Sequence, residues 1–235
     1  MQDLTLPALV TQGFTPPLSL AEFKLAAFDM DSTLITIECI DEIADAAGRK
    51  AEVAAITEAA MRGEITDFKD SLRRRLALLQ GVPATALDGV LNDRLRFNPG
   101  ARELCAALKA AGLKLVLVSG GFTFFTRYVA AQLGMDYVRS NELEIVDDAL
   151  TGRLIPQPWG EICDGAEKRR MLQECCDKIG CTPKQAIAVG DGANDLLMMG
   201  EAGLSVAFHA KPKVREQAMV AINSGGLEQL LQILR

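Results

Sequence analysis

The sequence carries no excess of positive charge. Its 235 residues include 25 Lys and Arg against 31 Asp and Glu, which gives a formal net charge of −6. Proteins that bind nucleic acid rely on clustered Lys and Arg that neutralise phosphates. The charge balance therefore argues against a nucleic-acid partner, although a small phosphorylated substrate needs only a few well-placed cations.

Histidine is almost absent, and the cysteines lack the spacing of a metal site. The one histidine is His209, and no second cysteine pair follows Cys175 and Cys176. A structural zinc site takes Cys and His ligands at characteristic spacings, so we expect no zinc. The cysteines are also too sparse for a disulfide scaffold. We expect reduced thiols packed as small hydrophobic side chains at Cys39, Cys105, Cys163, Cys175, Cys176 and Cys181.

Long hydrophobic runs are missing as well. No uncharged run reaches the roughly 20 residues that a transmembrane helix needs, and the N-terminus lacks the basic and apolar segments of a secretory signal. We therefore expect no membrane partner and a cytoplasmic location. With 49% hydrophobic residues, a chain of this length suits one domain with an insertion, or two modest domains. Whether it is a monomer or a homodimer stays open.

The sequence does contain a series of short apolar runs, each ending in a polar or glycine turn. They are rich in Val, Ile, Leu and Ala and do not alternate with polar residues, as expected for parallel strands covered on both faces. Segments with helical periodicity separate them, at about 99–111, 122–133 and 165–179. This order predicts an α/β fold, a doubly wound (Rossmann-like) parallel sheet, with strands at residues 24–29, 114–119, 186–191 and 204–208.

One stretch interrupts the alternation of strands and helices. Residues 38–95 read as helical throughout, which is too long for a simple crossover between two strands. We interpret them as a small inserted helical cap domain. The catalytic core would then consist of residues 22–37 and 96–235.

Two further segments have a distinct pattern. Residues 1–21 contain Pro and Gly and show no sustained period, so we interpret them as an N-terminal arm of uncertain order. Residues 141–156 alternate between apolar and polar side chains, which predicts a β-hairpin. Its turn would lie at Asp147-Asp148 or at Thr151-Gly152.

Polar side chains stand where the predicted strands end. Asp29, Ser119 and Asp191 each follow such a strand, and ligands of doubly wound sheets bind beyond the carboxyl ends of the strands. Singly, each of these residues is more often a turn former or a helix cap. Together with Asp31 and Asp195 they would place four carboxylates at one sheet edge, where they repel each other unless a divalent cation lies among them. Hard oxygen ligands favour Mg²⁺, which keeps positions open for water and phosphate.

Asp29 and Asp31 are suited to phosphoryl transfer. One aspartate can attack phosphorus when a cation offsets the charge, and a second can protonate the leaving alkoxide and then deprotonate a water. The second role requires a raised pKa, which a neighbouring carboxylate and partial desolvation provide. Ser119 and the Gly120 amide can bind phosphate oxygens, and Lys168 can supply positive charge.

Four motifs, in this order, resemble those of the haloacid-dehalogenase superfamily of aspartate-nucleophile phosphatases: "DMDST" (29–33), "SGG" (119–121), Lys168 and "GDGAND" (190–195). The resemblance covers essentially residues 22–235. Within the superfamily, three further segments resemble the phosphoserine phosphatase family: "ECIDEIADAAG" (38–48), "SLRRRLALL" (71–79) and "VSGGF" (118–122). Some bacterial members carry an N-terminal regulatory domain of the ACT type, of which residues 1–21 could be at most a remnant.

The resemblance implies a role for each residue of the core motifs. Asp29 would be the nucleophile that forms an aspartyl-phosphate, and Asp31 the general acid and base. Mg²⁺ would be held by the Asp29 carboxylate, the Asp31 backbone carbonyl and Asp191, with Asp195 supporting these ligands from behind. The phosphoryl group would be bound by Ser119, Gly120 and Lys168, and Asn194 would contact the substrate.

The resemblance also assigns the amino-acid end of the substrate. Glu38 would pair with the substrate ammonium and Arg75 with its carboxylate, for which a bidentate guanidinium is well suited. Glu38 has a competing interpretation as a charge in the first turn of a helix. Successive helical residues lie about 100° apart, so only one of Arg73, Arg74 and Arg75 can face a given site, and the resemblance selects Arg75. Met61 and Phe68 match cap positions that close over the substrate.

The implied activity is Mg²⁺-dependent hydrolysis of O-phosphoserine to serine and phosphate, the last step of serine biosynthesis. Two alternatives would keep the same motifs: a phosphotransferase from phosphoserine to another small alcohol, and a phosphatase for another small phosphomonoester. A non-catalytic ligand-binding module on this scaffold is a third alternative. The joint presence of Asp29, Asp31, Lys168 and Asp191 argues against it.

Overall fold

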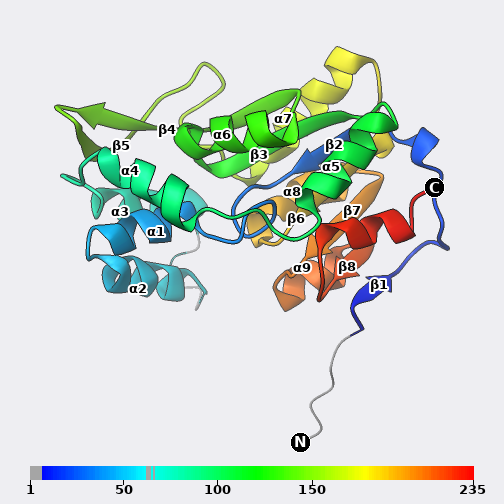
Figure 1. Ribbon diagram of the computed structural model, residues 1–235, viewed down its shortest axis with the longest axis horizontal. Coiled ribbons are helices and arrows are strands. Elements are labelled where there is room, and N and C mark those ends of the chain that lie inside the picture. Colours follow the sequence, from blue (N-terminus) through cyan, green and yellow to red (C-terminus); the bar gives the residue numbers. More distant parts are fainter. Residues whose placement is uncertain (1–6, 62–64, 66) are drawn as a thin grey trace, which may run out of the picture.

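The computed structural model describes residues 7–61, 65 and 67–235, and within them one eight-stranded sheet forms the centre of the molecule (Figure 1). The strand order is β1-β8-β7-β6-β2-β3-β4-β5. Strands β8 to β4 of this order run parallel, and the two edge strands, β1 and β5, are antiparallel to their neighbours. The strands are β1 Leu9–Thr11, β2 Leu25–Phe28, β3 Lys114–Phe122, β4 Tyr137–Val146, β5 Ala149–Ile155, β6 Ala186–Gly190, β7 Leu204–Phe208 and β8 Val220–Ile222.

Helices cover both faces of the sheet, which confirms the predicted doubly wound α/β fold. Successive strand residues point to opposite faces, so Phe28 belongs to one hydrophobic cluster and its neighbour Ala27 to the other. The first cluster includes α5 and α6 residues, and the second includes α7 and α8 residues. Every residue of β2, β6 and β7 is buried, which explains their uninterrupted apolar sequences.

Three crossover helices lie close to the positions that the sequence predicts: α5 Ala101–Ala110, α6 Thr123–Leu133 and α7 Gly165–Ile179. Two further helices, α8 Leu196–Glu201 and α9 Pro212–Gln217, were not predicted. Both α6 and α7 end at a glycine in the left-handed conformation, Gly134 and Gly180, the usual residue for this type of helix end. No helix within the described residues is long and apolar enough to cross a bilayer.

The segment between β2 and α5 folds into helices, as its periodicity predicts. They are α1 Cys39–Ala46, α2 Lys50–Met61, α3 Phe68–Ala77, α4 Thr85–Gly89 and the short π-helix η2 Val90–Arg94. These helices gather at one end of the molecule, next to the β4–β5 hairpin and away from β1 and β8 (Figure 1). The division into core and cap domains remains our interpretation of this arrangement.

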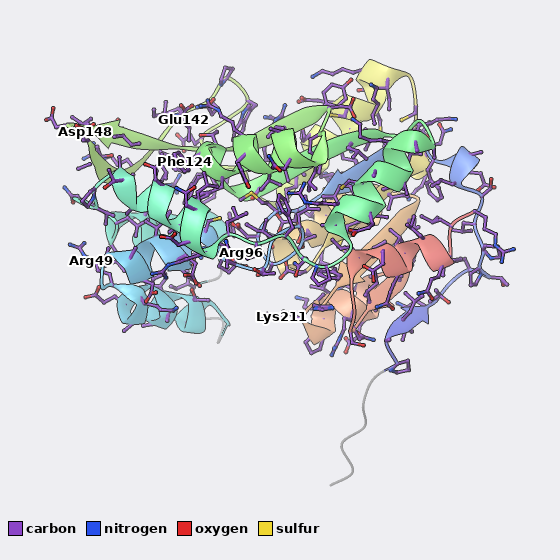
Figure 2. All side chains as sticks on the ribbon, in the orientation of Figure 1. Arg49, Arg96, Phe124, Glu142, Asp148 and Lys211 are labelled. Atoms are coloured by element: carbon purple, nitrogen blue, oxygen red, sulfur yellow. The ribbon has the colours of Figure 1, made fainter. Side chains whose placement is uncertain are left out.

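The β4–β5 hairpin turns at Asp147 and Asp148, the first of the two predicted positions. Both residues have positive φ values, 50° and 58°, as the tightest antiparallel turns require. The Asp148 carbonyl accepts a hydrogen bond from the Ala84 amide of the helical segment (2.8 Å). Figure 2 shows Asp148 at the tip of the hairpin.

The N-terminal arm contains a strand that the sequence analysis did not predict. Strand β1 pairs with β8, and the Leu18 amide donates to the Ile233 carbonyl (2.8 Å). Both β1 and β8 have three residues, too few to produce a recognisable period. Of the predicted arm, residues 1–6 lie outside the described part of the chain. Residues 9–11 form the edge strand, and Leu18 and Leu20 bond to the C-terminal residues Ile233 and Arg235.

Candidate active site

The carboxyl ends of β2, β3 and β6 meet at one edge of the sheet, because these three strands are parallel neighbours. A pocket of about 410 Å³ opens there, between the strand ends and helices α1 and α3. It is lined by most of the predicted site residues: Asp29, Asp31, Glu38, Arg75, Ser119, Gly120, Asp191 and Asn194. The other two, Lys168 and Asp195, are fully buried next to Asp29.

Asp29 directly follows β2 and is only 5% exposed. Its Oδ1 atom lies 2.6 Å from Lys168 Nζ. Burial and the nearby charges of Asp195 and Asp191 raise the pKa of Asp29 well above its ordinary value, and the Lys168 ammonium opposes that rise. The ammonium therefore favours the ionised carboxylate that a nucleophile must be.

Lys168 joins two carboxylates in the interior. Its Nζ atom lies 2.7 Å from Asp195 Oδ1 as well as close to Asp29. Burial lowers the pKa of Lys168, but the two carboxylates more than offset burial, so its net pKa is raised. Lys168 thus places a positive charge in the protein interior, in contact with the residue that follows β2.

Asp195 has no free oxygen. Its Oδ1 atom contacts Lys168, and Oδ2 accepts hydrogen bonds from the amides of Asp191 (3.2 Å) and Gly192 (3.1 Å). The side chain fills the space next to Gly190, where a Cβ atom would lie 2.4 Å from Asp195 Oδ2. The "GDGAND" motif thus folds into a turn in which Asp195 holds the Asp191 backbone.

Asp31 projects from a tight loop after β2. The loop places Ser32 at a φ of 56°, and the Ser32 amide donates to the Ile37 carbonyl (3.1 Å). Burial and the charge of Glu38 raise the pKa of Asp31 to about 8. The Oδ1 atom of Asp31 is buried without a hydrogen-bond partner among the described residues. Such a group can be protonated at neutral pH and can donate its proton to a ligand in the pocket.

The carboxylates of this edge fit a divalent cation. Oxygens of Asp29, Asp191 and Asp195 all lie within 4.8 Å of one another. Burial and Asp195 raise the pKa of Asp191 to about 7, which shows how much negative charge is concentrated there. Because both Asp195 oxygens are already engaged, Asp29 and Asp191 are the side chains of this cluster with capacity for a cation.

Ser119 and Gly120 come from the end of β3 and present a polar rim to the pocket. Ser119 Oγ accepts a hydrogen bond from the Gly121 amide (2.9 Å), which fixes the turn. Asn141 of β4 supports it: its Nδ2 donates to the Gly120 carbonyl (2.7 Å), and its Oδ1 accepts from the Cys163 amide (2.8 Å). The sequence analysis missed Asn141, because a single Asn in an alternating strand gives no signal of such a contact.

Glu38 and Arg75 face the pocket from the helical segment. Glu38 precedes α1, and its Oε1 accepts a hydrogen bond from Ser32 Oγ (2.5 Å). Water can reach Glu38, yet the concave pocket surrounds it with protein atoms, and this desolvation raises its pKa. Arg75 lies on α3, and desolvation lowers its pKa while the carboxylates of Asp41, Glu38 and Asp31 oppose that shift.

Other pocket residues were not expected. Asp41 of α1 and Lys211 of the core both line the pocket, and burial raises the pKa of Asp41. Asp41 follows Glu38 by three residues, so helical spacing would have placed the two on one face. Lys211 is labelled in Figure 2, and nothing in its sequence context distinguishes it from other lysines.

Of the two predicted cap positions, Phe68 packs on Gly120, where a Cβ atom would lie 3.0 Å from the Phe68 ring. The Met61 side chain lies outside the described residues.

All six cysteines are free thiols, as expected. Only Cys181 is partly accessible, and the other five are buried. None of them lines the pocket at the sheet edge.

Several known proteins are similar to this chain in sequence and in fold. The haloacid dehalogenase-like hydrolase family matches residues 26–200. The phosphoserine phosphatases of Polaromonas sp. and Albidiferax ferrireducens are each 68% identical to this chain over 229 residues, which is 97% of this chain and 97% of each relative. A solved structure described as a phospho-aspartyl intermediate analogue of phosphoserine phosphatase superimposes with a TM-score of 0.83 at 38% identity. It covers 91% of this chain and 99% of its own.

Proposed function

The chain belongs to the haloacid dehalogenase-like hydrolase family, and from this premise we propose that it hydrolyses O-phosphoserine to serine and phosphate through a phosphorylated Asp29. It is an enzyme, a phosphoric monoester hydrolase. The observation that carries the residue assignment is the contact of Asp29 with the buried Lys168, at the edge of a pocket that both Asp29 and Asp31 line. The Lys168 ammonium opposes the rise in the pKa of Asp29, and the pKa of Asp31 is about 8.

In the first step an Asp29 oxygen attacks the phosphorus atom. A bond forms between this oxygen and phosphorus, and the bond from phosphorus to the seryl oxygen breaks. Asp31 donates its proton to the departing seryl oxygen, so that serine leaves as the neutral alcohol. The products of this step are serine and the aspartyl-phosphate.

In the second step water attacks the same phosphorus atom. Asp31, now ionised, accepts a proton from the water, and the bond between phosphorus and the Asp29 oxygen breaks. Phosphate leaves, and both aspartates return to their starting protonation states. A single side chain can serve as acid and then as base because its pKa of about 8 lies near neutral pH.

Ser119, Gly120 and Lys168 would bind the phosphoryl oxygens, and Asn194 would contact the substrate. Lys168 Nζ lies 2.6 Å from Asp29 Oδ1, so a phosphoryl group on Asp29 would be within its reach. The turn that presents Ser119 is fixed by its bond from the Gly121 amide. Transfer of a phosphoryl group depends mainly on such positioning and charge stabilisation.

The cofactor we propose is Mg²⁺, held by the Asp29 carboxylate, the Asp31 backbone carbonyl and Asp191, with Asp195 fixing the Asp191 backbone. When bound, the ion would offset the negative charge of these carboxylates and of the phosphoryl oxygens. Thr33 supports the Asp191 side chain, because its Oγ1 donates to Asp191 Oδ1 (3.3 Å).

Glu38 and Arg75 would recognise the ammonium and carboxylate of the seryl group. Both come from the helical segment 38–95, and both line the same pocket as Asp29. We propose that this segment acts as a cap that closes over bound phosphoserine and excludes bulk water. We also place the enzyme in the cytoplasm, in the last step of serine biosynthesis; its free, mostly buried thiols suit a reducing compartment.

A phosphate-release assay tests this proposal. The wild-type protein should release phosphate from O-phosphoserine with Mg²⁺ and lose this activity after exhaustive chelation. A competing small alcohol distinguishes hydrolysis from phosphotransfer, because only a phosphotransferase would phosphorylate that alcohol. No release from phosphoserine, or full activity without a divalent cation, would contradict the proposal.

Asp29→Asn should abolish turnover and leave the fold intact. The amide is close in shape to the carboxylate but is not a nucleophile, and Lys168 keeps its contact with Asp195 at 2.7 Å. Activity, the circular dichroism spectrum and the melting temperature measure these effects. Recovery of labelled phosphate on Ser119 of the wild-type enzyme would show that Asp29 is not the nucleophile.

A further inference from the structure

Helix α3 presents two different faces to the rest of the molecule. Phe68, Leu72 and Arg75, spaced by three and four residues, line the active-site pocket. Lys69 and Arg73, one turn apart, instead contact the core segment of residues 161–164, which leads into α7. The same helix thus binds the proposed substrate on one side and the core on the other.

Two ion pairs form the contact between α3 and this core segment. Lys69 Nζ lies 3.2 Å from Asp164 Oδ2, and Arg73 Nη2 lies 3.0 Å from Glu161 Oε2. The neighbouring Arg74 pairs within its own helix, with Asp70 at 2.9 Å. Within the described residues, Lys69 and Arg73 therefore bridge to the core, whereas Arg74 does not.

Asp164 connects this contact to the catalytic lysine. It caps the N-terminus of α7, because its Oδ1 accepts a hydrogen bond from the Glu167 amide (2.9 Å). Its carbonyl accepts from the Lys168 amide (2.9 Å). Lys69 therefore contacts the same turn that carries Lys168 to Asp29.

Leu72 and Leu76 of α3 are buried in the hydrophobic core, and backbone hydrogen bonds attach the chain to β5 just beyond the C-terminal end of the helix. The Gly81 amide donates to the Leu150 carbonyl, and the Leu150 amide donates to the Val82 carbonyl, each at 2.8 Å. Among the described residues, no backbone hydrogen bond joins α3 to residues 156–164. A pocket of about 350 Å³ lies beside Arg73 and Glu161. The contact between α3 and residues 161–164 therefore depends on side chains, including the two ion pairs.

We propose that Lys69 and Arg73 are positioning residues, whose ion pairs with Asp164 and Glu161 hold α3 against the core and so keep Phe68 and Arg75 over the substrate. This inference rests on the proposed phosphoserine phosphatase activity. Both pairs are solvent-accessible, with the side chains of Lys69 and Glu161 41% and 74% exposed. Exposed pairs shift an equilibrium by no more than about fivefold each, which suits a contact that must open in every cycle.

Charge reversal of the Arg73–Glu161 pair tests the inference. Arg73→Glu should raise KM for phosphoserine and lower kcat/KM by about three- to tenfold, because one attraction becomes a repulsion. The double variant Arg73→Glu/Glu161→Arg restores the attraction and should recover most of the loss. Arg74→Glu is the matched control and should change kcat/KM less than twofold. Asp164 is left unchanged, because it also caps α7.

Two further measurements separate positioning from a loss of structure. The deficit of Arg73→Glu should shrink in 0.5 M NaCl, since salt screens exposed charges, and Lys69→Gln should show a smaller deficit with the same salt dependence. Melting temperatures should stay close to that of the wild type. The inference is wrong if the wild type is active and Arg73→Glu has the same kcat/KM, or if the double variant does not recover the kcat/KM that Arg73→Glu loses. Either result would leave the proposed function intact. Absence of wild-type activity on phosphoserine would instead refute the proposed function.

Discussion

At the scale of single residues, the environment of each carboxylate decides its role. Asp29 and Asp31 are separated by one residue, but Asp29 contacts a buried ammonium, whereas Asp31 Oδ1 lacks a hydrogen-bond partner in the described part of the chain. The Lys168 ammonium favours the ionised form of Asp29 and opposes the rise in pKa that burial causes, and a pKa of about 8 favours the protonated form of Asp31 at neutral pH. This difference is what an attacking group and a proton donor require.

Asp31→Asn should therefore affect substrates according to their leaving groups. Hydrolysis of phosphoserine should fall by about 10²–10⁴-fold, the usual contribution of general acid–base catalysis. Phosphorylation of the enzyme by p-nitrophenyl phosphate should suffer much less, because that leaving group needs little protonation. Burst kinetics with both esters measure the effect, and equal losses would exclude Asp31 as the acid.

Arg75→Ala should weaken the recognition of the substrate carboxylate. We expect kcat/KM for phosphoserine to fall by a factor equivalent to roughly 2–4 kcal/mol, because a bidentate pair is lost and a charge is left unpaired. Phosphoethanolamine lacks the carboxylate, so it should be a poor substrate that the variant handles as the wild type does. Steady-state kinetics with both substrates test this.

Arg74→Ala is the appropriate control for Arg75. From the sequence alone, helical spacing predicts that Arg73 and Arg74 point elsewhere when Arg75 faces the site. Arg73 does point away from the pocket, but it pairs with Glu161, so we expect its replacement to lower kcat/KM. An equal loss on both substrates in Arg75→Ala would mean that Arg75 contacts phosphate or shapes the helix instead.

At the scale of elements, the turn after β6 depends on a glycine, Gly190, because there is no room for a side chain at that position. Gly190 ends this strand, and a Cβ there would lie 2.4 Å from the Asp195 carboxylate. The Asp195 side chain also holds the Asp191 and Gly192 amides and Lys168. Packing at the end of one strand thus controls three groups of the site.

Gly190→Ala should lower both activity and stability. The methyl group would displace Asp195, so we expect a loss of about 1–3 kcal/mol in the free energy of unfolding, as for other overpacked positions, together with a lower affinity for Mg²⁺. Gly200→Ala in α8 is the matched control. A Cβ there meets no atom within 4 Å, and replacing a helical glycine with alanine is expected to stabilise by about 0.5–1 kcal/mol. Urea denaturation and Mg²⁺ titration measure both effects, and an unchanged Gly190→Ala protein would contradict this account.

At the scale of the whole molecule, the charge concentrated at the sheet edge makes stability depend on pH. Without a cation, the pKa of Asp29 is raised, that of Asp31 is about 8 and that of Asp191 about 7. The unfolded chain loses these protons near pH 4, so the folded state binds more protons between pH ~4 and ~8. The free energy of unfolding should therefore fall as the pH rises through this range.

Thermal melts in a chelator test this prediction. The melting temperature should be higher at pH 5.5 than at pH 8, and Mg²⁺ should restore stability at pH 8, because a cation among the carboxylates favours their ionised forms. In Asp31→Asn the dependence on pH should be weaker, since one of the raised groups is gone. A chelated protein that becomes more stable from pH 5.5 to pH 8 would contradict the charge distribution described here.

The sequence by itself determined the fold class and most of the site. Apolar runs that end in Asp29, Ser119 and Asp191 suit buried parallel strands, and parallel strands bring their carboxyl ends to one edge. Helical periods predicted α6 and α7 to within a residue of their ends. Apolar runs and helical periods are properties of short segments, so they can be read from the sequence without knowledge of the tertiary structure.

Only the tertiary structure decided which groups meet across distant segments. Lys168 and Asp195 lie 27 residues apart and were both expected near the site, yet their direct contact depends on how α7 packs against the turn after β6. Asn141 and the Arg73–Glu161 pair have no local signal, because each matters only through a partner elsewhere in the chain. The strands β1 and β8 are too short for any period, and their pairing joins the N-terminal arm to a strand near the C-terminus.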